Sequence, residues 1–315
     1  MRIASNKITD VVRFFRDELK DLYDKEELET FIAYCFEEFL NIKKIDIVSK
    51  GADTISESEL LKFNFAIKDL KKYKPIQYIL GKADFYGLKF IVNEYVLIPR
   101  QETEELVHLI IQENEEVRIE KSESRSEKEE GKTEKRENFE LSTLNSILDI
   151  GTGSGCIPIV LKKKIPAATI FAIDISEKAL EIAKQNARSN DVDIEFIQHD
   201  ILSKNKLHLS TDVKFDIIVS NPPYIRENEK QQMHKNVLDY EPHLALFVSD
   251  NDPLLFYDVI ANFALKKLNK NGKIYFEINE AFGWETKQML ESKGFKNVRL
   301  VKDLHNKNRI LRGNL

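Results

Sequence analysis

The sequence predicts an α/β protein with a doubly wound, mostly parallel sheet, preceded by a small helical domain and a β-hairpin connector. Three observations carry this prediction. Apolar residues recur at helical spacing through residues 1–82. Beyond residue 140, short apolar strands alternate with helical segments, which is typical of βα units around a parallel sheet. Gly, Asp and Asn-Pro follow these strands directly, where doubly wound sheets bind their ligands.

The helical domain is expected at residues 1–82, with a core built from two apolar stripes. The stripes are Ile8, Val11, Val12, Phe15, Leu19 and Leu22, and then Leu28, Phe31, Ile32, Cys35, Phe36 and Phe39. Ser56 and Glu59 have the spacing of a capping box, so a further helix is expected to begin after Ser56. Stripes of this kind are typical of a packed core, and no chemistry is assigned to them.

The connector is expected at residues 83–98, as two β-type runs separated by a turn at Asn93-Glu94. Residues 99–315 form the α/β domain, in which a first helix begins at Glu102. Strands follow at residues 147–150, 169–174, 194–198, 215–220 and 272–278, with a helix at residues 177–188.

A charged segment interrupts this domain at residues 113–140. It has no hydrophobic periodicity, and 18 of its 28 residues are charged, 11 of them Glu. Such a composition cannot bury enough apolar surface to order itself, so the segment is predicted to be a solvated, disordered insertion.

Composition excludes several classes of protein. The formal net charge is −5, whereas a dedicated nucleic-acid binder usually has a basic field. The two cysteines and six histidines have no metal-ligand spacing, so neither a metal site nor a disulfide framework is expected. No run of 18 apolar residues and no secretory signal occur, which predicts a cytoplasmic protein without membrane contact.

A glycine-rich turn follows the strand at residues 147–150 and has the sequence Gly151-Thr152-Gly153-Ser154-Gly155. Glycines there allow a tight turn and close approach of the backbone to a ligand. Asp174 ends the next strand, where a carboxylate can accept both hydroxyls of a ribose. Asp200 and Ile201 follow the third strand, where they would meet an adenine edge and face. The combination predicts a nucleoside site.

The sequence Asn221-Pro222-Pro223-Tyr224 follows the fourth strand. The Asn221 side-chain oxygen and the Pro222 carbonyl can accept the two N–H bonds of a planar NH₂ group and aim its nitrogen at an electrophilic methyl. The prolines stiffen the loop, and Tyr224 offers an aromatic wall for a planar amide or base. This pattern predicts methyl transfer to an amide or amino nitrogen.

Further stretches accompany these two motifs, at residues 75–81, 85–87, 96–100, 102–104, 240–242 and 245–246. Together they resemble the peptide chain release factor glutamine methyltransferases, the HemK/PrmC family of class I S-adenosylmethionine-dependent enzymes. The resemblance covers about residues 1–112 and 141–315.

The resemblance implies a Rossmann-like methyltransferase fold and N5-methylation of the glutamine in the Gly-Gly-Gln motif of class 1 release factors. S-adenosylmethionine would be the cofactor and S-adenosylhomocysteine a product. Cofactor-binding residues would be Gly151, Thr152, Gly153, Ser154, Gly155, Asp174, Asp200, Ile201 and Asn221. Asn221, Pro222, Pro223 and Tyr224 would bind the substrate amide, with Asn221, Pro222 and Tyr224 catalytic.

The partner expected from this resemblance is a release factor, gripped with the help of the helical domain, and the enzyme is expected to be a monomer without direct nucleic-acid contact. Two other readings stay open. An N6-adenine or N2-guanine nucleic-acid methyltransferase would use the same NH₂ clamp, although it needs a basic face or a target-recognition domain. A non-catalytic cofactor-binding module would have no need of the clamp.

Overall fold

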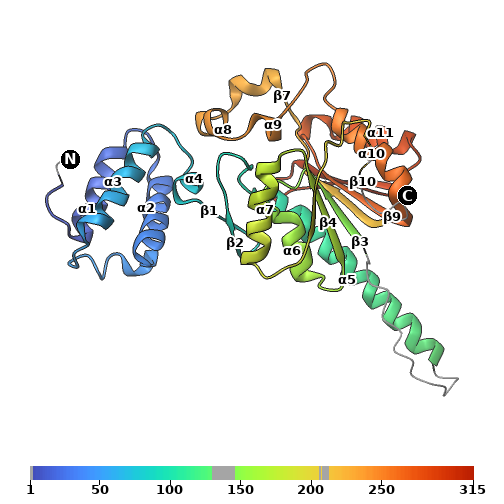
Figure 1. Ribbon diagram of the computed structural model, residues 1–315, viewed down its shortest axis with the longest axis horizontal. Coiled ribbons are helices and arrows are strands. Elements are labelled where there is room, and N and C mark those ends of the chain that lie inside the picture. Colours follow the sequence, from blue (N-terminus) through green and yellow to red (C-terminus); the bar gives the residue numbers. More distant parts are fainter. Residues whose placement is uncertain (1–2, 130–145, 206, 208–212) are drawn as a thin grey trace. The chain divides into compact units, whose positions relative to one another are not determined.

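The computed structural model describes residues 3–129, 146–205, 207 and 213–315, which divide into two compact units (Figure 1). The first unit contains Met1–Lys82 together with Met233–Tyr240. The second contains Ala83–Gln232 and Glu241–Leu315.

The first unit is helical, with α1 (Ile8–Leu19), α2 (Lys25–Leu40), α3 (Glu57–Leu70), α4 (Ile76–Leu80) and α8 (Lys235–Tyr240). The apolar stripes predicted from the sequence form its core, except that Leu22 lies beyond the end of α1 and is 37% exposed and Phe39 is half-buried. Ser56 and Glu59 form the predicted capping box at the start of α3. Burial of one face on each of α1, α2, α3 and α4 therefore holds this unit together.

The segment of residues 233–240 belongs to the helical unit although it is distant in sequence. The Tyr240 hydroxyl donates a hydrogen bond to the Lys72 carbonyl at 2.9 Å, and the Lys235 ammonium lies 5.7 Å from the centre of the Tyr73 ring. The sequence placed this segment in the large domain, because long-range contacts of this kind leave no local pattern.

The connector contains a two-stranded sheet of β1 (Lys82–Phe85) and β2 (Leu88–Ile91). Its turn is Tyr86-Gly87, with φ angles of 51° and 76°, and not the predicted Asn93-Glu94. Two consecutive positive φ angles are what a two-residue hairpin turn requires, and glycine adopts one of them without strain. Residues 95–98 are therefore not a second strand of this hairpin.

The second unit is built on a seven-stranded sheet with the order β10-β11-β9-β6-β3-β4-β5. Its strands are β3 (Ser146–Ile150), β4 (Thr169–Asp174), β5 (Glu195–Gln198), β6 (Phe215–Ser220), β9 (Leu268–Glu277), β10 (Lys296–Lys302) and β11 (Asn308–Asn314). Five of them, β3, β4, β5, β6 and β9, run parallel to one another. Strand β11 is antiparallel to both of its neighbours, β9 and β10. Strand order reverses at β3, so a ligand crevice is expected at the carboxyl ends of β3 and β6.

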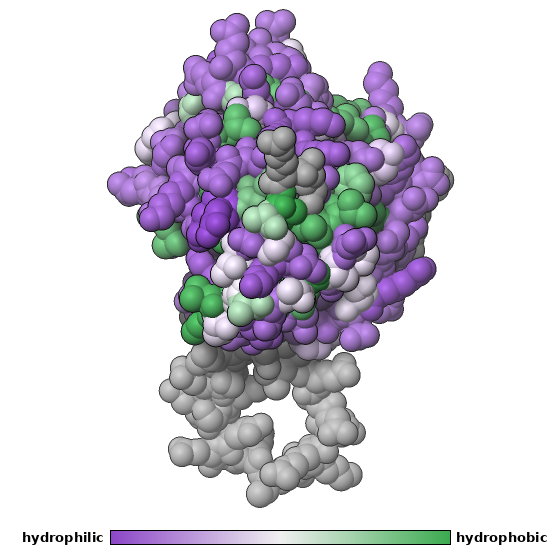
Figure 2. Space-filling model, turned by 90° about the vertical axis from the view of Figure 1, so that its left-hand side faces the viewer, coloured by the Kyte–Doolittle hydropathy of each residue, from purple (hydrophilic) through white to green (hydrophobic). Residues whose placement is uncertain are grey.

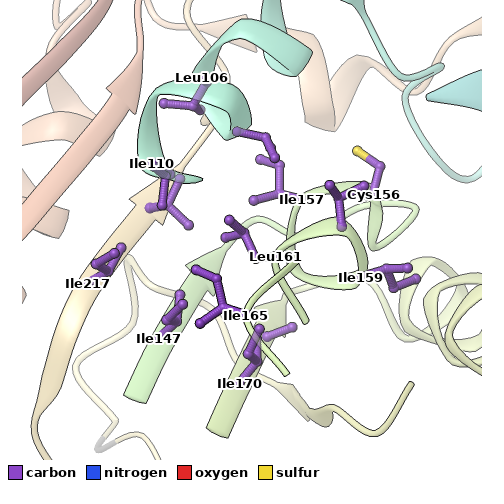
Figure 3. Close-up of a cluster of buried hydrophobic side chains, with 14 of the residues drawn as sticks. Leu106, Ile110, Ile147, Cys156, Ile157, Ile159, Leu161, Ile165, Ile170 and Ile217 are labelled. Atoms are coloured by element: carbon purple, nitrogen blue, oxygen red, sulfur yellow. The ribbon is translucent and has the colours of Figure 1, made fainter. Parts of the chain in front are cut away.

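Helices cover both faces of the sheet (Figure 1). They are α5 (Gln101–Glu129), α6 (Cys156–Lys164) and α7 (Glu177–Ser189) on one face, and α10 (Leu255–Lys267) and α11 (Gly283–Ser292) on the other. Alternate strand residues supply the two cores. Ile147 and Ile217 face the first core, where Leu106 and Leu161 pack (Figure 3), while Leu148 faces the second. This alternation confirms the predicted doubly wound sheet.

Short elements connect the β6 end to α10: β7 (Ile225–Arg226), a 3-10 turn at Glu227–Gln232, α9 (His243–Leu246) and β8 (Phe247–Val248). The strands β7 and β8 pair in parallel as a small separate sheet.

The predicted disordered insertion at residues 113–140 is wrong over its first part, because α5 continues without a break to Glu129. Residues 130–140 lie outside the described residues. Glu113 is not a solvated side chain: its carboxylate lies 2.6 Å from the Lys273 ammonium and 2.8 Å from Arg312, and accepts a hydrogen bond from Tyr275. Partners contributed by β9 and β11, which the local charge pattern cannot reveal, therefore hold this turn of the helix.

The surface in Figure 2 is mostly hydrophilic, with hydrophobic side chains in separate patches. Within the described ranges, no helix is long and apolar enough to cross a membrane.

Candidate functional site

A cavity of about 300 Å³ lies at the carboxyl ends of the parallel strands in the second unit. Its wall brings together most of the residues predicted from the sequence: Gly151, Thr152, Gly153, Ser154, Asp174, Asp200, Ile201, Asn221, Pro222 and Pro223. Gly155 and Tyr224 are the two predicted site residues that do not line it. Its volume suits a small organic ligand.

The glycine-rich turn leaves β3 and leads into α6 with positive φ angles at Gly151, Gly153 and Gly155. The amides of Gly151 and Thr152 both donate to the Ile173 carbonyl of β4, at 2.9 and 3.0 Å. The turn is thereby fastened against the neighbouring strand, with its backbone open to the cavity.

Gly155 has a different role from the other glycines of the turn. A Cβ atom at this position would lie 3.1 Å from the Ala183 Cβ and 3.2 Å from the Ile159 side chain. The absence of a side chain therefore lets α6 and α7 approach each other beneath the turn, which makes Gly155 a packing residue.

The Asp174 carboxylate stands at the end of β4, and each of its oxygens accepts one backbone hydrogen bond. Oδ2 accepts from the Gly153 amide at 2.8 Å and Oδ1 from the Ser176 amide at 2.9 Å. Burial raises the pKa of Asp174, and these amides oppose that rise in part. Since each carboxylate oxygen has two lone pairs, one on each stays available for a diol.

Asp200 and Ile201 line the cavity from the loop that follows β5. The Asp200 Oδ1 accepts a hydrogen bond from the Leu202 amide at 2.9 Å, which fixes the carboxylate in a local turn. Ile201 supplies an apolar wall and packs on the second core.

Asp149 is a buried acid directly under the turn, for which the sequence suggested no role. It is 0% exposed, and neither of its oxygens has a hydrogen-bond partner among the described residues. The Thr152 hydroxyl lies close enough to lower the pKa in part but outside hydrogen-bonding geometry. Burial, reinforced by the charge of Asp174, raises the pKa of Asp149 to about 7. Asp149 is not among the residues that line the cavity, so its unpaired oxygens lie beneath the glycine-rich turn and not in the cavity wall.

Asn221 follows β6 directly and faces the cavity with Pro222 and Pro223. Its Nδ2 donates to the Thr103 hydroxyl at 3.2 Å. The side-chain oxygen takes no hydrogen bond from any residue that the structure describes. It is therefore an available acceptor for an N–H group in the cavity.

The sequence predicted that Tyr224 forms an aromatic wall of the site, but Tyr224 does not line the cavity. Its ring packs on the second core, and its hydroxyl donates to Glu277 Oε1 at 3.0 Å. Burial, followed by the charge of Glu277, raises the pKa of Tyr224 well above its ordinary value. Tyr224 therefore anchors the Asn-Pro-Pro-Tyr loop to the second core and to Glu277.

Sequence reasoning also missed Thr103 and Glu277. Thr103 lines the cavity from the first turn of α5 and donates to Glu277 Oε2 at 2.6 Å. Glu277 ends β9 and is 1% exposed. One signal could have found it, because a carboxylate at the end of a predicted parallel strand is the rule that identified Asp174.

Three charged residues near the connector differ in position. Arg100 lines the cavity and forms an ion pair with Glu241, whose other oxygen accepts from the Ile98 amide. Glu104 instead accepts from the Tyr86 amide at 2.6 Å and holds the hairpin. Glu102 is not among the cavity residues.

Cys156 also lines the cavity, but burial raises the pKa of its thiol to about 12, which leaves it unsuited to act as a nucleophile. In the part of the chain that the structure describes, no cluster of His, Cys, Asp and Glu could hold a metal ion.

The parallel sheet carries a glycine-rich turn, a carboxylate and an Asn-Pro-Pro-Tyr loop at its strand ends, and an antiparallel β11 lies beside β9. This arrangement, with the match to a methyltransferase domain, defines a class I S-adenosylmethionine-dependent methyltransferase. Comparisons with known proteins identify the group within this class. Residues 136–241 match the methyltransferase small domain, and residues 10–81 match the PrmC N-terminal domain. The chain belongs to the release factor glutamine methyltransferase family.

Two relatives support this assignment. The release factor glutamine methyltransferase of Flavobacterium psychrophilum is 46% identical over 95% of this chain and 96% of its own length. That of Bacteroides thetaiotaomicron is 40% identical over 98% of this chain and 99% of its own. Among solved structures, the hMettl16 catalytic domain in complex with MAT2A 3′UTR hairpin 6 is similar with a TM-score of 0.50, 16% identity and 82% coverage of each chain. At that identity the likeness concerns the fold alone.

Proposed function

We propose that this protein transfers a methyl group from S-adenosylmethionine to the N5 nitrogen of the glutamine in the Gly-Gly-Gln motif of class 1 peptide chain release factors. The products are N5-methylglutamine and S-adenosylhomocysteine. The observation that carries the proposal is that Asn221 lines the cavity together with the glycine-rich turn while its Nδ2 is bonded to Thr103, which leaves the oxygen as its acceptor for a ligand. The names of the full-length relatives support the choice of a release factor.

The cofactor is held by the turn and by three side chains. Gly151, Thr152, Gly153 and Ser154 offer backbone to the methionine part, as part of the turn at residues 151–155. Asp174 accepts the ribose hydroxyls, while Asp200 and Ile201 contact the adenine. The unpartnered Thr152 hydroxyl, on a residue that lines the cavity, fits a polar ligand.

The substrate amide is held by Asn221 and by the Pro222 carbonyl, each of which accepts one N–H bond of the glutamine side chain. When bound, S-adenosylmethionine supplies an electrophilic methyl on its sulfonium. The nitrogen lone pair of an amide is delocalised into its carbonyl, so the nitrogen must be polarised and oriented. Two acceptors polarise its N–H bonds and aim the nitrogen at that methyl. The methylated nitrogen is acidic and loses its proton to water, so no strong base is needed. Pro223 stiffens the loop and Tyr224 braces it.

Replacing Asp174 by alanine is expected to weaken S-adenosylmethionine binding by about 1–3 kcal/mol, since two ribose hydroxyls lose their acceptor. Isothermal titration calorimetry measures this loss directly. Asp174→Asn keeps one acceptor oxygen and should lose less. The exposed Asp252→Ala serves as the matched control. Equal affinities in Asp174→Ala and wild type would contradict the ribose assignment.

The function is tested by incubating the protein with labelled S-adenosylmethionine and a purified class 1 release factor. Parallel reactions contain a release factor whose Gly-Gly-Gln glutamine is replaced, DNA, or RNA. We expect label in the intact release factor alone. Label in a nucleic acid would instead identify an adenine or guanine methyltransferase that uses the same clamp.

The proposal places the enzyme in the cytoplasm, where its substrate takes part in translation. The enzyme acts there as a monomer on a protein partner, without direct nucleic-acid contact. Light scattering after size-exclusion chromatography, alone and with release factor, gives the stoichiometry. A stable dimer of the free enzyme would contradict this part of the proposal.

A further inference from the structure

The amide of Asn221 has two chemically different ends, and only one of them is useful to the proposed reaction. The oxygen can accept an N–H bond from the target, whereas the NH₂ end would oppose the target NH₂ group donor to donor. The two ends have nearly the same shape, so packing alone does not choose between them. Something in the site must therefore fix which end faces the cavity.

The single proton of the Thr103 hydroxyl determines which end of the Asn221 amide can bond to it. This hydroxyl donates to Glu277 Oε2 at 2.6 Å, and a hydroxyl has only one proton to give. Toward Asn221 it can therefore only accept, and it accepts from Nδ2 at 3.2 Å. An amide turned end for end would set two oxygens against each other with no proton between them.

Glu277 accepts the one proton that the Thr103 hydroxyl can donate. Its carboxylate is 1% exposed and accepts from two hydroxyls, that of Thr103 on Oε2 and that of Tyr224 on Oε1 at 3.0 Å. Burial raises the pKa of Glu277, and the charge of Glu102 adds to this rise, while both hydrogen bonds and the charge of Arg309 oppose it in part. With one hydroxyl donor on each oxygen, the carboxylate is the acceptor in both hydrogen bonds.

We propose that Thr103 and Glu277 are positioning residues that hold the Asn221 amide with its oxygen toward the cavity. The inference rests on the proposed function, in which this oxygen accepts an N–H bond of the substrate. The three residues come from the start of α5, the end of β6 and the end of β9. Three separate elements thus determine the direction of one amide.

The test compares Thr103→Val with Thr103→Ser in the full chain. Valine has nearly the same shape but no acceptor, so the amide samples both directions and kcat is expected to fall about tenfold. The Kd for S-adenosylmethionine should stay within about twofold, since the hydroxyl acts on Asn221. Serine keeps the hydroxyl and should recover most of kcat. A Thr103→Val enzyme with wild-type kcat, or one whose kcat is not recovered by serine, would overturn the proposal.

A double-mutant cycle separates positioning from a general structural effect. If Thr103 acts through Asn221, then Thr103→Val has no further effect on kcat in an Asn221→Ala background. A further tenfold fall in the double variant would mean that Thr103 acts independently. Thr286→Val is the matched control, because it removes another buried threonine hydroxyl, one that donates to the Phe282 carbonyl directly before α11. It should keep wild-type kcat.

Failure of this inference and failure of the proposed function give different results. If wild-type protein labels no release factor, the function is wrong, and the same variants are then compared on whichever NH₂ substrate accepts the label. If wild-type protein labels the release factor and Thr103→Val does so equally fast, only the positioning role is wrong.

Discussion

Replacing Asn221 by alanine is expected to slow methyl transfer by about 10²-fold or more while S-adenosylmethionine binding stays nearly intact. The amide oxygen is the one side-chain acceptor that the described Asn-Pro-Pro-Tyr loop directs into the cavity. Without it the substrate nitrogen keeps only the Pro222 carbonyl, so the nitrogen is neither fully oriented nor polarised. Single-turnover transfer of labelled methyl measures the chemical step, and calorimetry measures cofactor binding.

Two further variants sharpen this result. Asn262→Ala removes an exposed asparagine of α10 that bonds Asp258, and it should transfer methyl at the wild-type rate. Asn221→Asp keeps an oxygen facing the cavity but loses the donor to Thr103, so its rate should lie between those of alanine and wild type. Unchanged turnover in Asn221→Ala would show that the loop does not act as a clamp.

Replacing Asp149 by asparagine is expected to change how the free energy of unfolding depends on pH. The folded protein holds a proton on Asp149 up to its raised pKa of about 7, whereas the unfolded chain releases it near the ordinary aspartate pKa of 3.8. Between these values folding takes up a proton, so the wild type loses stability as pH rises through this window. From pH 5 to pH 8 the loss from this group is about 3 kcal/mol, and the asparagine variant lacks it.

The measurement is urea unfolding of both proteins at pH 5, 6, 7 and 8 without added cofactor. Acids that do not interact with Asp149 contribute equally to both proteins, so the difference between the two curves reports on Asp149 and on its interaction with Asp174. Asp193→Asn is the control, because that side chain is exposed and meets solvent in both states. A difference that stays constant from pH 5 to pH 8 would mean that Asp149 has no raised pKa in the folded protein.

The sequence carried enough information for the fold and for ten of the residues that line the cavity. Parallel strands end at one edge of a sheet, so Asp174 and Asn221 could be brought together from their positions after two apolar runs. The glycine-rich turn could also be predicted, because the strand before it and the helix after it are adjacent in the chain. Each of these predictions needed only local pattern and one topological rule.

The roles that were not predicted depend on contacts between residues far apart in sequence and on the direction of their hydrogen bonds. Thr103 and Glu277 are 174 positions apart, and the direction of a hydrogen bond between them leaves no trace in composition. Asp149 stands within an apolar strand, and only the folded structure shows that its oxygens lack partners. Tyr224 was assigned to the wrong side of its loop, since a motif names the residue but not where its ring packs.

The helical unit is assembled from two pieces of chain, because residues 233–240 pack with residues 1–82. No single cut can therefore release it intact. A fragment of residues 1–82 would lack α8 and leave the Lys72 carbonyl and the Tyr73 ring without their contacts to Tyr240 and Lys235. A fragment of residues 83–315 would carry α8 without the helical unit to which it belongs. Studies of either half need a connected chain, such as residues 1–82 joined by a flexible linker to residues 233–240.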